Sequence, residues 1–304
     1  MEAVQNVENK KINANEIQRI NKQTFAQRLS GYKRQPLSLF LLIVVCLSAL
    51  LTVGVLLFLI GYILINGIPN IKPELFEWEY NTDNVSMLPS MINTLYMTGL
   101  TLLMAVPVGV FSAIYMVEYA KRGSKLVKIV RTTTETLQGI PSIVYGLFGY
   151  LMFVIGCHWG YTLMAGAITL AIMVLPVIMR TTEEALLSVP DSYREGSFGL
   201  GAGGLRTVFV IVLPSAMPGI FSGIILAIGR IVGETAALIF TAGTVATAAT
   251  GVMDSTRTLA VHMYCLLSEG LYMKQAYATA VVLLVMVLVI NAISGMIAKK
   301  FTKK

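Results

Sequence analysis

Two long stretches without a charged residue limit what this chain can fold into. Residues 37–65 form an uncharged run of 29 residues, and residues 136–179 form another of 44. As α-helices these runs would be about 43 Å and about 66 Å long, whereas the hydrocarbon core of a bilayer is about 30 Å thick. The first run therefore predicts one membrane span. The second predicts two spans, and we place the turn between them at the Gly-Cys-His-Trp-Gly of residues 156–160.

The composition also favours a membrane protein. Apolar residues make up 56% of the chain and charged residues 13%, whereas a soluble domain carries about 25% charged residues. The net charge is +7, but the cations flank the apolar runs, so we expect no nucleic-acid binding. The three cysteines lack metal-ligand spacing, so we expect neither a metal site nor a disulfide framework. The polar start of the chain predicts no cleavable signal peptide.

The pattern as a whole predicts an all-α integral membrane fold with six spans. The expected spans are residues 37–65, 93–117, 140–155, 161–179, 217–241 and 276–298. The expected polar parts are a tail at 1–36, a basic loop at 118–135, a second loop at 180–216 and a lysine-rich end at 299–304, with the membrane core at 93–298. This division places 19 of the 23 lysines and arginines on one side. The positive-inside rule then predicts that both termini are cytoplasmic.

The loop at residues 180–216 carries the most specific pattern. Ser192 and Glu195 have the spacing of a capping box, in which two side chains cap the first turn of a helix. Gly199 and Gly201 are suitable residues for ending that helix. The pattern predicts a short helix held off the membrane, which is typical of a docking element. The alternative is an ordinary loop between two spans.

The same loop resembles a known family motif. Glu195, Gly196 and Ser197 are followed after three residues by Gly201, and after nine more by the Ile-Val-Leu-Pro of residues 211–214. This arrangement resembles the EAA loop of permease subunits of binding-protein-dependent ABC importers, with Gly196 and Ser197 in place of two alanines. The resemblance implies the type I importer (MetI-like) permease fold, whose loop helix sits in a groove of an ATPase subunit. The implied ATPase-docking residues are Ser192, Glu195, Gly196, Ser197 and Gly201.

A second segment narrows the resemblance to phosphate importers. Residues 229–236 read Gly-Arg-Ile-Val-Gly-Glu-Thr-Ala, which resembles the G-R-x-x-G-E-T-A segment of phosphate importer permeases of the PstA type. Residues 136–149 are similar to the same group. The resemblance implies import of inorganic phosphate into the cytoplasm across the cell (inner) membrane. The implied partners, besides membrane lipid, are a homologous PstC-type permease, two PstB-type ATPase subunits and an extracytoplasmic PstS-type phosphate-binding protein.

Arg230 and Glu234 are charged residues inside an expected span, four positions apart. A charge at the centre of a bilayer costs about 2.5–3.5 kcal/mol on insertion scales, so such residues usually pair or face a polar cavity. Two interpretations remain open: the residues neutralise each other at a subunit interface, or they line the translocation path, where a guanidinium suits phosphate oxygens. Arg180 is a second candidate cation for the path or an ordinary positive-inside anchor. Gly229 and Gly233 form a GxxxG pair, which predicts close helix packing.

Several other functions find little support. The chain contains no Gly-x-x-x-x-Gly-Lys-Ser/Thr loop, so we expect no enzyme activity and no cofactor in it, with ATP and Mg²⁺ bound by the partner ATPase. A Gly-x-Gly-x-x-Gly pattern at residues 199–204 follows no expected strand. His158 and His262 are the only histidines, and no acid–base cluster of a membrane-bound enzyme is evident. The remaining alternatives are a permease for another oxyanion, such as molybdate or sulfate, and an ion-coupled secondary transporter.

Overall fold

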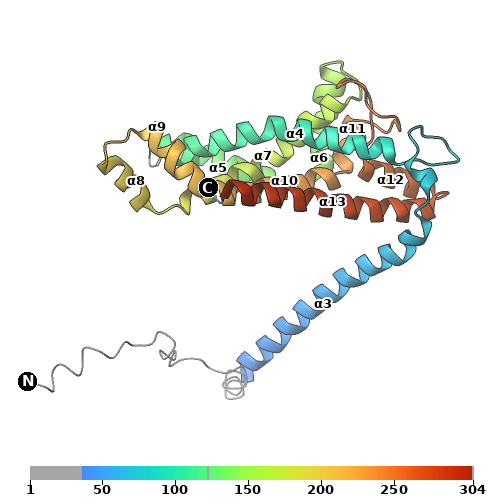
Figure 1. The fold of residues 1–304 in the computed structure, drawn as a ribbon, viewed down its shortest axis with the longest axis horizontal. Helices are drawn as coiled ribbons and strands as arrows, with labels where there is room; N and C mark the ends of the chain where they lie inside the picture. Colours follow the sequence, from blue (N-terminus) through green and yellow to red (C-terminus); the bar gives the residue numbers. More distant parts are fainter. Residues whose placement is uncertain (1–35, 122, 303–304) are drawn as a thin grey trace, which may run out of the picture. The chain divides into compact units, whose positions relative to one another are not determined.

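The computed structural model describes residues 36–121 and 123–302, and every regular element in that part of the chain is helical (Figure 1). Most of the predicted tail, Arg122 of the basic segment and the last two lysines lie outside the described residues. Two units are distinguished, residues 1–61 and residues 62–304. Most of the helix α3 (Pro36–Gly67) belongs to the first, and its most apolar window contains no buried residue. An exposed apolar helix of this length suits a lipid environment.

The second unit is a bundle of the remaining helices. In chain order they are the 3₁₀ turns η1 (Ile68–Asn70) and η2 (Pro73–Phe76), then α4 (Leu88–Ile114), the π-helical turn η3 (Tyr115–Tyr119), α5 (Lys125–Gln138), α6 (Ser142–Gly149), the π-helical turn η4 (Tyr150–Gly156), α7 (Leu163–Leu187), α8 (Asp191–Gly199), α9 (Gly204–Thr207), the π-helical turn η5 (Val208–Val212), α10 (Leu213–Gly233), α11 (Ala236–Thr241), α12 (Leu259–Glu269) and α13 (Met273–Thr302).

The predicted number of spans agrees with the helices. Five segments are long and apolar enough to cross a membrane: Leu37–Asn70, Leu88–Tyr119, Leu163–Leu187, Gly204–Gly233 and Met273–Lys300. A sixth candidate is the pair Lys125–Gln138 and Ser142–Gly156, which is bent by 105° at its break. The described residues therefore hold six spans when the bent pair is counted as one.

The basic segment at residues 118–135 was predicted as a loop, and this prediction is wrong for most of its length. The helix α5 occupies it from Lys125 onward. Val127 and Val130, three residues apart on one helix face, pack with Met116 and Met179. The lysines and arginines occupy the other faces, so an amphipathic helix forms where charge density alone indicated a loop. The third span is accordingly bent, rather than a straight helix over 140–155.

At the other boundaries, the helices extend further into the predicted loops than the apolar runs indicated. The predicted turn at residues 156–160 is confirmed, with left-handed backbone at His158 (φ +56°) and Gly160 (φ +68°). The loop predicted at 180–216 is shorter, because α7 continues to Leu187 and a new helix begins at Gly204. A helix needs no apolar residues once it has left the hydrocarbon core, so charged turns extend the spans.

The helix α7 lies at the centre of the second unit. In its most apolar window 61% of the residues are buried, and its buried residues pack against α4 and α10. The helices α8 and α9 lie at one end of the bundle and α12 lies at the other (Figure 1). The carboxyl end of α13 lies at the α8 end. The two regions that the sequence singled out, the loop helix and the Arg230 segment, are therefore separated along the bundle.

Candidate functional site

The short helix predicted in the polar loop exists, but its start differs from the prediction. The helix α8 begins at Asp191 after Pro190, whose backbone is extended (φ −57°, ψ 138°), and no side chain caps it. Ser192 is therefore the second helical residue, and the predicted capping box with Glu195 is wrong. Proline fixes its own φ and lacks an N–H, so it starts the helix two residues early. Asp191 places a negative charge at the helix N-terminus, which the helix dipole favours.

The end of α8 agrees with the prediction. The helix stops at Gly199, and Gly201 adopts the left-handed conformation with φ +83°. The Gly201 amide donates to the Phe198 carbonyl at 2.9 Å, and the Ala202 amide donates to the Ser197 carbonyl at 3.1 Å. These bonds satisfy carbonyls that the helix end leaves free.

The helix α8 has an inner and an outer face. Arg194 and Ser197, three residues apart, form the inner face. Ser197 is 4% exposed, and its hydroxyl lies 2.8 Å from that of Thr207 in α9. Ser197 is therefore buried against α9, whereas the sequence placed it among the docking residues. The other predicted docking residues, Ser192, Glu195, Gly196 and Gly201, are exposed.

Apolar side chains accompany the outer face. Tyr193 and Phe198 are about half exposed, Leu205 is more so, and Leu200 is 91% exposed. Together they give α8 and the segment that follows it an exposed apolar surface beside the Glu195 carboxylate. Exposed apolar clusters rimmed by polar groups mark interaction sites in many proteins. The exposed members of the predicted docking set therefore lie beside exposed apolar side chains.

Arg194 holds the inner face of α8 to the rest of the bundle. Its Nη2 donates to Glu118 Oε1 at 2.7 Å and to the Leu186 carbonyl at 3.0 Å. Its Nε lies 3.3 Å from both Glu118 carboxylate oxygens, and its Nη1 donates to the Val189 carbonyl at 2.8 Å. A bond from Nη1 to Asp191 at 3.2 Å completes the set. The hydrogen bond with Glu118 is the largest of the effects that raise the pKa of Arg194.

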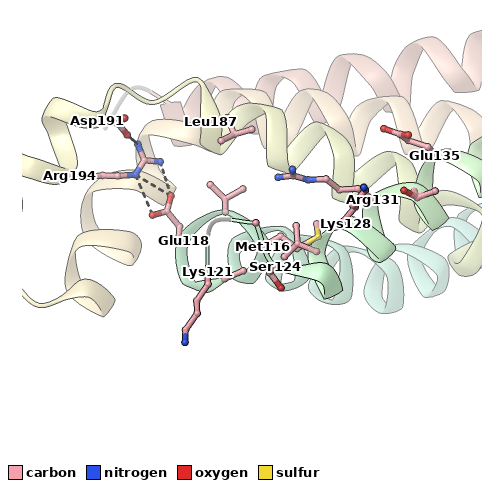
Figure 2. A pocket seen from close by; sticks show the side chains of 15 residues that line it. Met116, Glu118, Lys121, Ser124, Lys128, Arg131, Glu135, Leu187, Asp191 and Arg194 are labelled. Atoms are coloured by element: carbon pink, nitrogen blue, oxygen red, sulfur yellow. Dashed lines mark hydrogen bonds and ion pairs between the residues drawn. The ribbon is translucent and has the colours of Figure 1, made fainter.

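A cavity of about 710 Å³ lies beside this ion pair (Figure 2). Figure 2 shows Glu118 and Arg194 at one side of it and Arg131 with Glu135 at the other. It is lined by Met116, Val117, Glu118, Ala120, Lys121, Gly123, Ser124, Val127, Lys128, Arg131, Thr132, Glu135, Leu187, Asp191 and Arg194. Arg131 forms an ion pair with Glu183 of α7. Cations and carboxylates alternate along the cavity, so its wall is charged but close to balanced.

Arg180 does not join Arg230 in one site. Arg180 Nε pairs with Glu184 Oε1 at 3.0 Å, four residues later on α7, and both side chains are more than half exposed. Exposed pairs of this kind contribute little to stability. Arg180 lies seven residues from the α8 end of α7, whereas Arg230 lies near the opposite end of α10. Gly223 of α10 lies against Thr181 of α7, so the seven residues from Gly223 to Arg230 place the two arginines roughly 10 Å apart along the bundle.

The predicted arrangement of Arg230 and Glu234 on one helix face is wrong. The helix α10 ends at Gly233, and Glu234 has extended backbone (φ −72°, ψ 130°). The buried Glu234 carboxylate accepts a hydrogen bond from the Ala237 amide at 3.1 Å, so it caps the start of α11. Among the described ion pairs none joins Glu234 to Arg230, which is half-buried. The helix breaks because Gly233 resists helix formation and the carboxylate satisfies free amides of the next helix.

The predicted packing of the GxxxG pair is not met within this chain either. A Cβ added at Gly229 or Gly233 would meet no atom within 4 Å. The half-buried Arg230 therefore stands between two glycines with open space beside them, at the end of α10. Arg230 lies within electrostatic reach of Tyr145 of α6. Of the two predicted path arginines, Arg180 has a carboxylate partner among the described ion pairs and Arg230 has none.

Sequence reasoning missed a buried cation at the end of the bundle opposite α8. Arg257 is 5% exposed, and its guanidinium lies 4.5 Å from the centre of the Tyr80 ring. His262 of α12 is fully buried and meets the edge of the same ring. Burial, and then the Arg257 charge, lower the pKa of His262 to about 3. The one signal for it in the sequence is that Arg257 falls on the side of the membrane that is predicted to carry few lysines and arginines.

The depressed pKa of His262 predicts an acid-sensitive stability. The folded protein holds a neutral imidazole where the unfolded chain binds a proton near pH 6.5, so the stabilisation is complete above pH 6.5 and lost as pH falls toward 3. Between pH 6.5 and 5 the loss amounts to about 2 kcal/mol. We expect the thermal midpoint of purified protein to fall less steeply over this range in His262→Leu. His158→Asn is the control, because His158 is exposed and Asn tolerates its positive φ. Parallel profiles for wild type and His262→Leu would contradict the assignment.

Comparison with known proteins gives a consistent set of relatives. The family described as binding-protein-dependent transport system inner membrane component matches residues 105–304. The probable ABC transporter permease protein YqgI of Bacillus subtilis is 36% identical over 284 residues, covering 84% of this chain and 94% of that protein. The phosphate transport system permease protein PstA of Haemophilus influenzae is 32% identical over 71% of this chain and 77% of its own length. PstA 1 of Mycobacterium tuberculosis H37Rv is 39% identical over about half of each chain, 51% and 49%.

Solved structures share the fold. A bacterial alginate ABC transporter in complex with its periplasmic protein has a chain that superimposes with a TM-score of 0.65 at 15% identity, covering 90% of this chain and 98% of that one. The MetNI methionine ABC transporter superimposes with a TM-score of 0.56 at 20% identity, covering 70% and 93%. These similarities confirm the fold class predicted from the sequence.

Proposed function

This chain belongs to the binding-protein-dependent transport system inner membrane components, and we propose that it carries inorganic phosphate into the cytoplasm. It is a multi-pass membrane protein and the permease subunit of an ABC importer. The phosphate assignment rests on the similarity to several PstA proteins at 32–39% identity. A half-buried Arg230 without a carboxylate partner among the described ion pairs supports it, because a guanidinium matches phosphate oxygens.

The assembly that we propose contains four further subunits. They are a homologous permease of the PstC type, two ATPase subunits of the PstB type and an extracytoplasmic phosphate-binding protein of the PstS type. ATP and Mg²⁺ would be bound by the ATPase subunits, and this chain would need no cofactor. Closure of the ATPases would displace α8, and the spans would then open the path toward the binding protein.

The α8 end of the bundle is the cytoplasmic end in this proposal. The carboxyl end of α13, with Lys299 and Lys300 in its last turn, lies at the end where α8 lies (Figure 1), and α5 begins with Lys125 and Lys128 at that end. The positive-inside rule favours the cytoplasm for such an end. The carboxyl end of α13 is then cytoplasmic, and the predicted tail lies on the same side when six spans are crossed.

The experiment that tests the substrate is uptake into proteoliposomes that contain the whole complex. We expect labelled phosphate to accumulate only when ATP is present on the cytoplasmic side of the membrane and the loaded binding protein is present on the opposite side. Unlabelled sulfate and molybdate should compete poorly. Transport of either of those anions in preference to phosphate would overturn the substrate, while leaving the family intact.

The two faces of α8 predict a contrast in crosslinking to the ATPase. We expect Ser192→Cys to crosslink to an ATPase subunit through a short thiol-directed reagent, because Ser192 is on the exposed face. Ser197→Cys is the matched control, since the same exchange places a thiol on the buried face beside Thr207. Both variants are made in a chain without Cys46, Cys157 and Cys265, because the first two are exposed. Equal crosslinking from both positions would contradict the assignment of the faces.

A further inference from the structure

The attachment of α8 to the bundle is concentrated in very few contacts. On its inner face, Ser197 meets Thr207 at 2.8 Å, and Arg194 meets Glu118 at 2.7 Å. Thr207 ends α9, which continues through η5 into α10. Glu118 lies in η3, which continues α4. These two side chains thus tie α8 to α4 and to the segment that leads into α10, and Arg194 also bonds the Leu186 carbonyl at the end of α7.

The contact with Glu118 is the stronger of the two. All five N–H groups of Arg194 have an acceptor within 3.3 Å, shared among Glu118, Asp191 and the carbonyls at the base of α8. The side chains of Arg194 and Glu118 are only 16% and 9% exposed. A charge-assisted bond that is shielded from water resists separation far better than an exposed ion pair. Movement of α8 therefore carries Glu118 with it.

Because of the cavity, α8 is linked to α4 but not to α5. The space of about 710 Å³ lies between α8 and α5, with Arg194 at one side and Lys128 and Arg131 at the other (Figure 2). Arg131 is paired with Glu183 of α7 rather than with α8. The helix α8 is therefore linked to α4 across Glu118 and separated from α5 by open space. A displacement of α8 reaches α4 without pushing α5 directly.

The segments at both attachment points have π-helical geometry. Glu118 lies in the turn Tyr115–Tyr119, and Val208–Val212 follows Thr207 directly. Such turns contain an extra residue per turn, and they occur frequently at functional sites. The described helices thus place π-helical turns where the two spans meet α8.

We propose that Glu118 is a positioning residue that, through Arg194, transmits the movement of α8 to α4 during transport. The inference rests on the proposed function, in which ATPase closure displaces α8. Glu118 does not touch the ATPase, because it faces the inner side of α8. Removing its charge should therefore leave docking intact and separate ATP hydrolysis from substrate movement.

The test compares two activities of the reconstituted complex, phosphate uptake and ATP hydrolysis stimulated by the loaded binding protein. In Glu118→Gln the amide oxygen still accepts from Arg194, but the charge is lost. We expect uptake per hydrolysed ATP to fall about tenfold, as loss of one charge-assisted bond predicts, while the amount of ATPase bound to the complex stays unchanged. Glu118→Asp, which keeps the charge on a shorter side chain, should recover part of this ratio.

Glu183→Gln is the matched control, because it removes a carboxylate that pairs with Arg131 across the cavity and does not touch α8. Its ratio of uptake to hydrolysis should equal that of wild type. If Glu118→Gln fails to assemble, the ratio is measured in Glu118→Asp. A wild-type ratio in whichever variant assembles, or an equal decrease in Glu183→Gln, would overturn the proposal. Absence of phosphate uptake by wild type would instead contradict the substrate, and the ratio of uptake to hydrolysis would then be measured with the anion that wild type does transport.

Discussion

Replacing Gly146 by valine should largely prevent this chain from accumulating as folded protein. A Cβ at Gly146 would lie 2.8 Å from the Ala237 Cα and 3.2 Å from the carbonyl oxygens of Ala236 and Ala237. These are backbone atoms of α11, so no side-chain rotation can relieve the clash. Gly146 and Ala237 are both buried. Overpacking of a core costs about 1–3 kcal/mol when side chains can adjust, and a displaced backbone should cost more.

The position of Gly146 makes the clash consequential for the site. Gly146 lies in α6, and the start of the neighbouring helix α11 is capped by the Glu234 carboxylate. Displacing α11 would pull at that cap and at the end of α10 that bears Arg230. We therefore expect the remaining folded fraction of Gly146→Val to transport poorly. Gly146→Ala should show a smaller loss of the same kind, since its Cβ lies in the same place without further methyl groups.

The measurement is the yield of monodisperse protein in mild detergent, together with its thermal midpoint. Gly99→Val is the matched control, because Gly99 is an exposed helical glycine of α4 whose Cβ would meet no atom within 4 Å. It carries the same cost of placing a β-branched residue in a helix. Equal yields and midpoints for Gly146→Val and Gly99→Val would show that α6 and α11 do not approach as closely as described.

The number of spans and the existence of α8 could be predicted from the sequence, because each depends on local pattern. Charge-free runs longer than a bilayer must cross it or turn back, and glycines mark where a short helix stops. The length of the second run required a turn before α7, and the composition of residues 156–160 indicated its place. These features require no knowledge of which residues meet across the bundle.

The faces of the helices could not be predicted, because they depend on tertiary contacts. Ser197 belongs to the docking motif by its position, but Thr207 ten residues later turns it inward. Arg257 was not singled out, because the Tyr80 ring that lies against its guanidinium is far away in the sequence. The helix α5 was not predicted, because the many charged residues around Val127 and Val130 obscured their helical spacing.

The break at the end of α10 is the most consequential of these differences. Residues 217–241 read as one apolar span, and Arg230 and Glu234 then share a face by spacing. A single hydrogen bond from Ala237 to Glu234 shows that the carboxylate starts a new helix instead. Spacing rules hold only within one helix, so the predicted ion pair had no basis once Gly233 ended it.

This break changes what is expected of Arg230 and Glu234 in transport. If the two residues only neutralised each other, removing both charges would restore what either single change loses. The structure separates their roles: Glu234 caps α11, and Arg230 stays free of a carboxylate among the described ion pairs. We expect Arg230→Gln to lower phosphate uptake about tenfold to a hundredfold, the loss of one hydrogen bond to a charged group.

Glu234→Gln should retain most of the uptake, because the amide oxygen of Gln can still accept from the Ala237 amide. The double variant should then transport as poorly as Arg230→Gln alone. Arg230→Lys should recover only part of the activity, since an ammonium keeps the charge but lacks the planar fork that meets two phosphate oxygens. Arg180→Gln is the comparison cation, and we expect it to retain uptake because its exposed partner is Glu184.

The measurement is initial phosphate uptake at matched abundance of assembled complex. Restored uptake in the double variant would revive the neutralising pair and remove both residues from the translocation path. Normal uptake by Arg230→Gln would remove Arg230 alone. If the double variant takes up little phosphate while Glu234→Gln remains active, charge balance cannot be the cause, since the double variant is neutral at both positions. Together with partial recovery in Arg230→Lys, this result would indicate that the guanidinium of Arg230 meets the anion that passes.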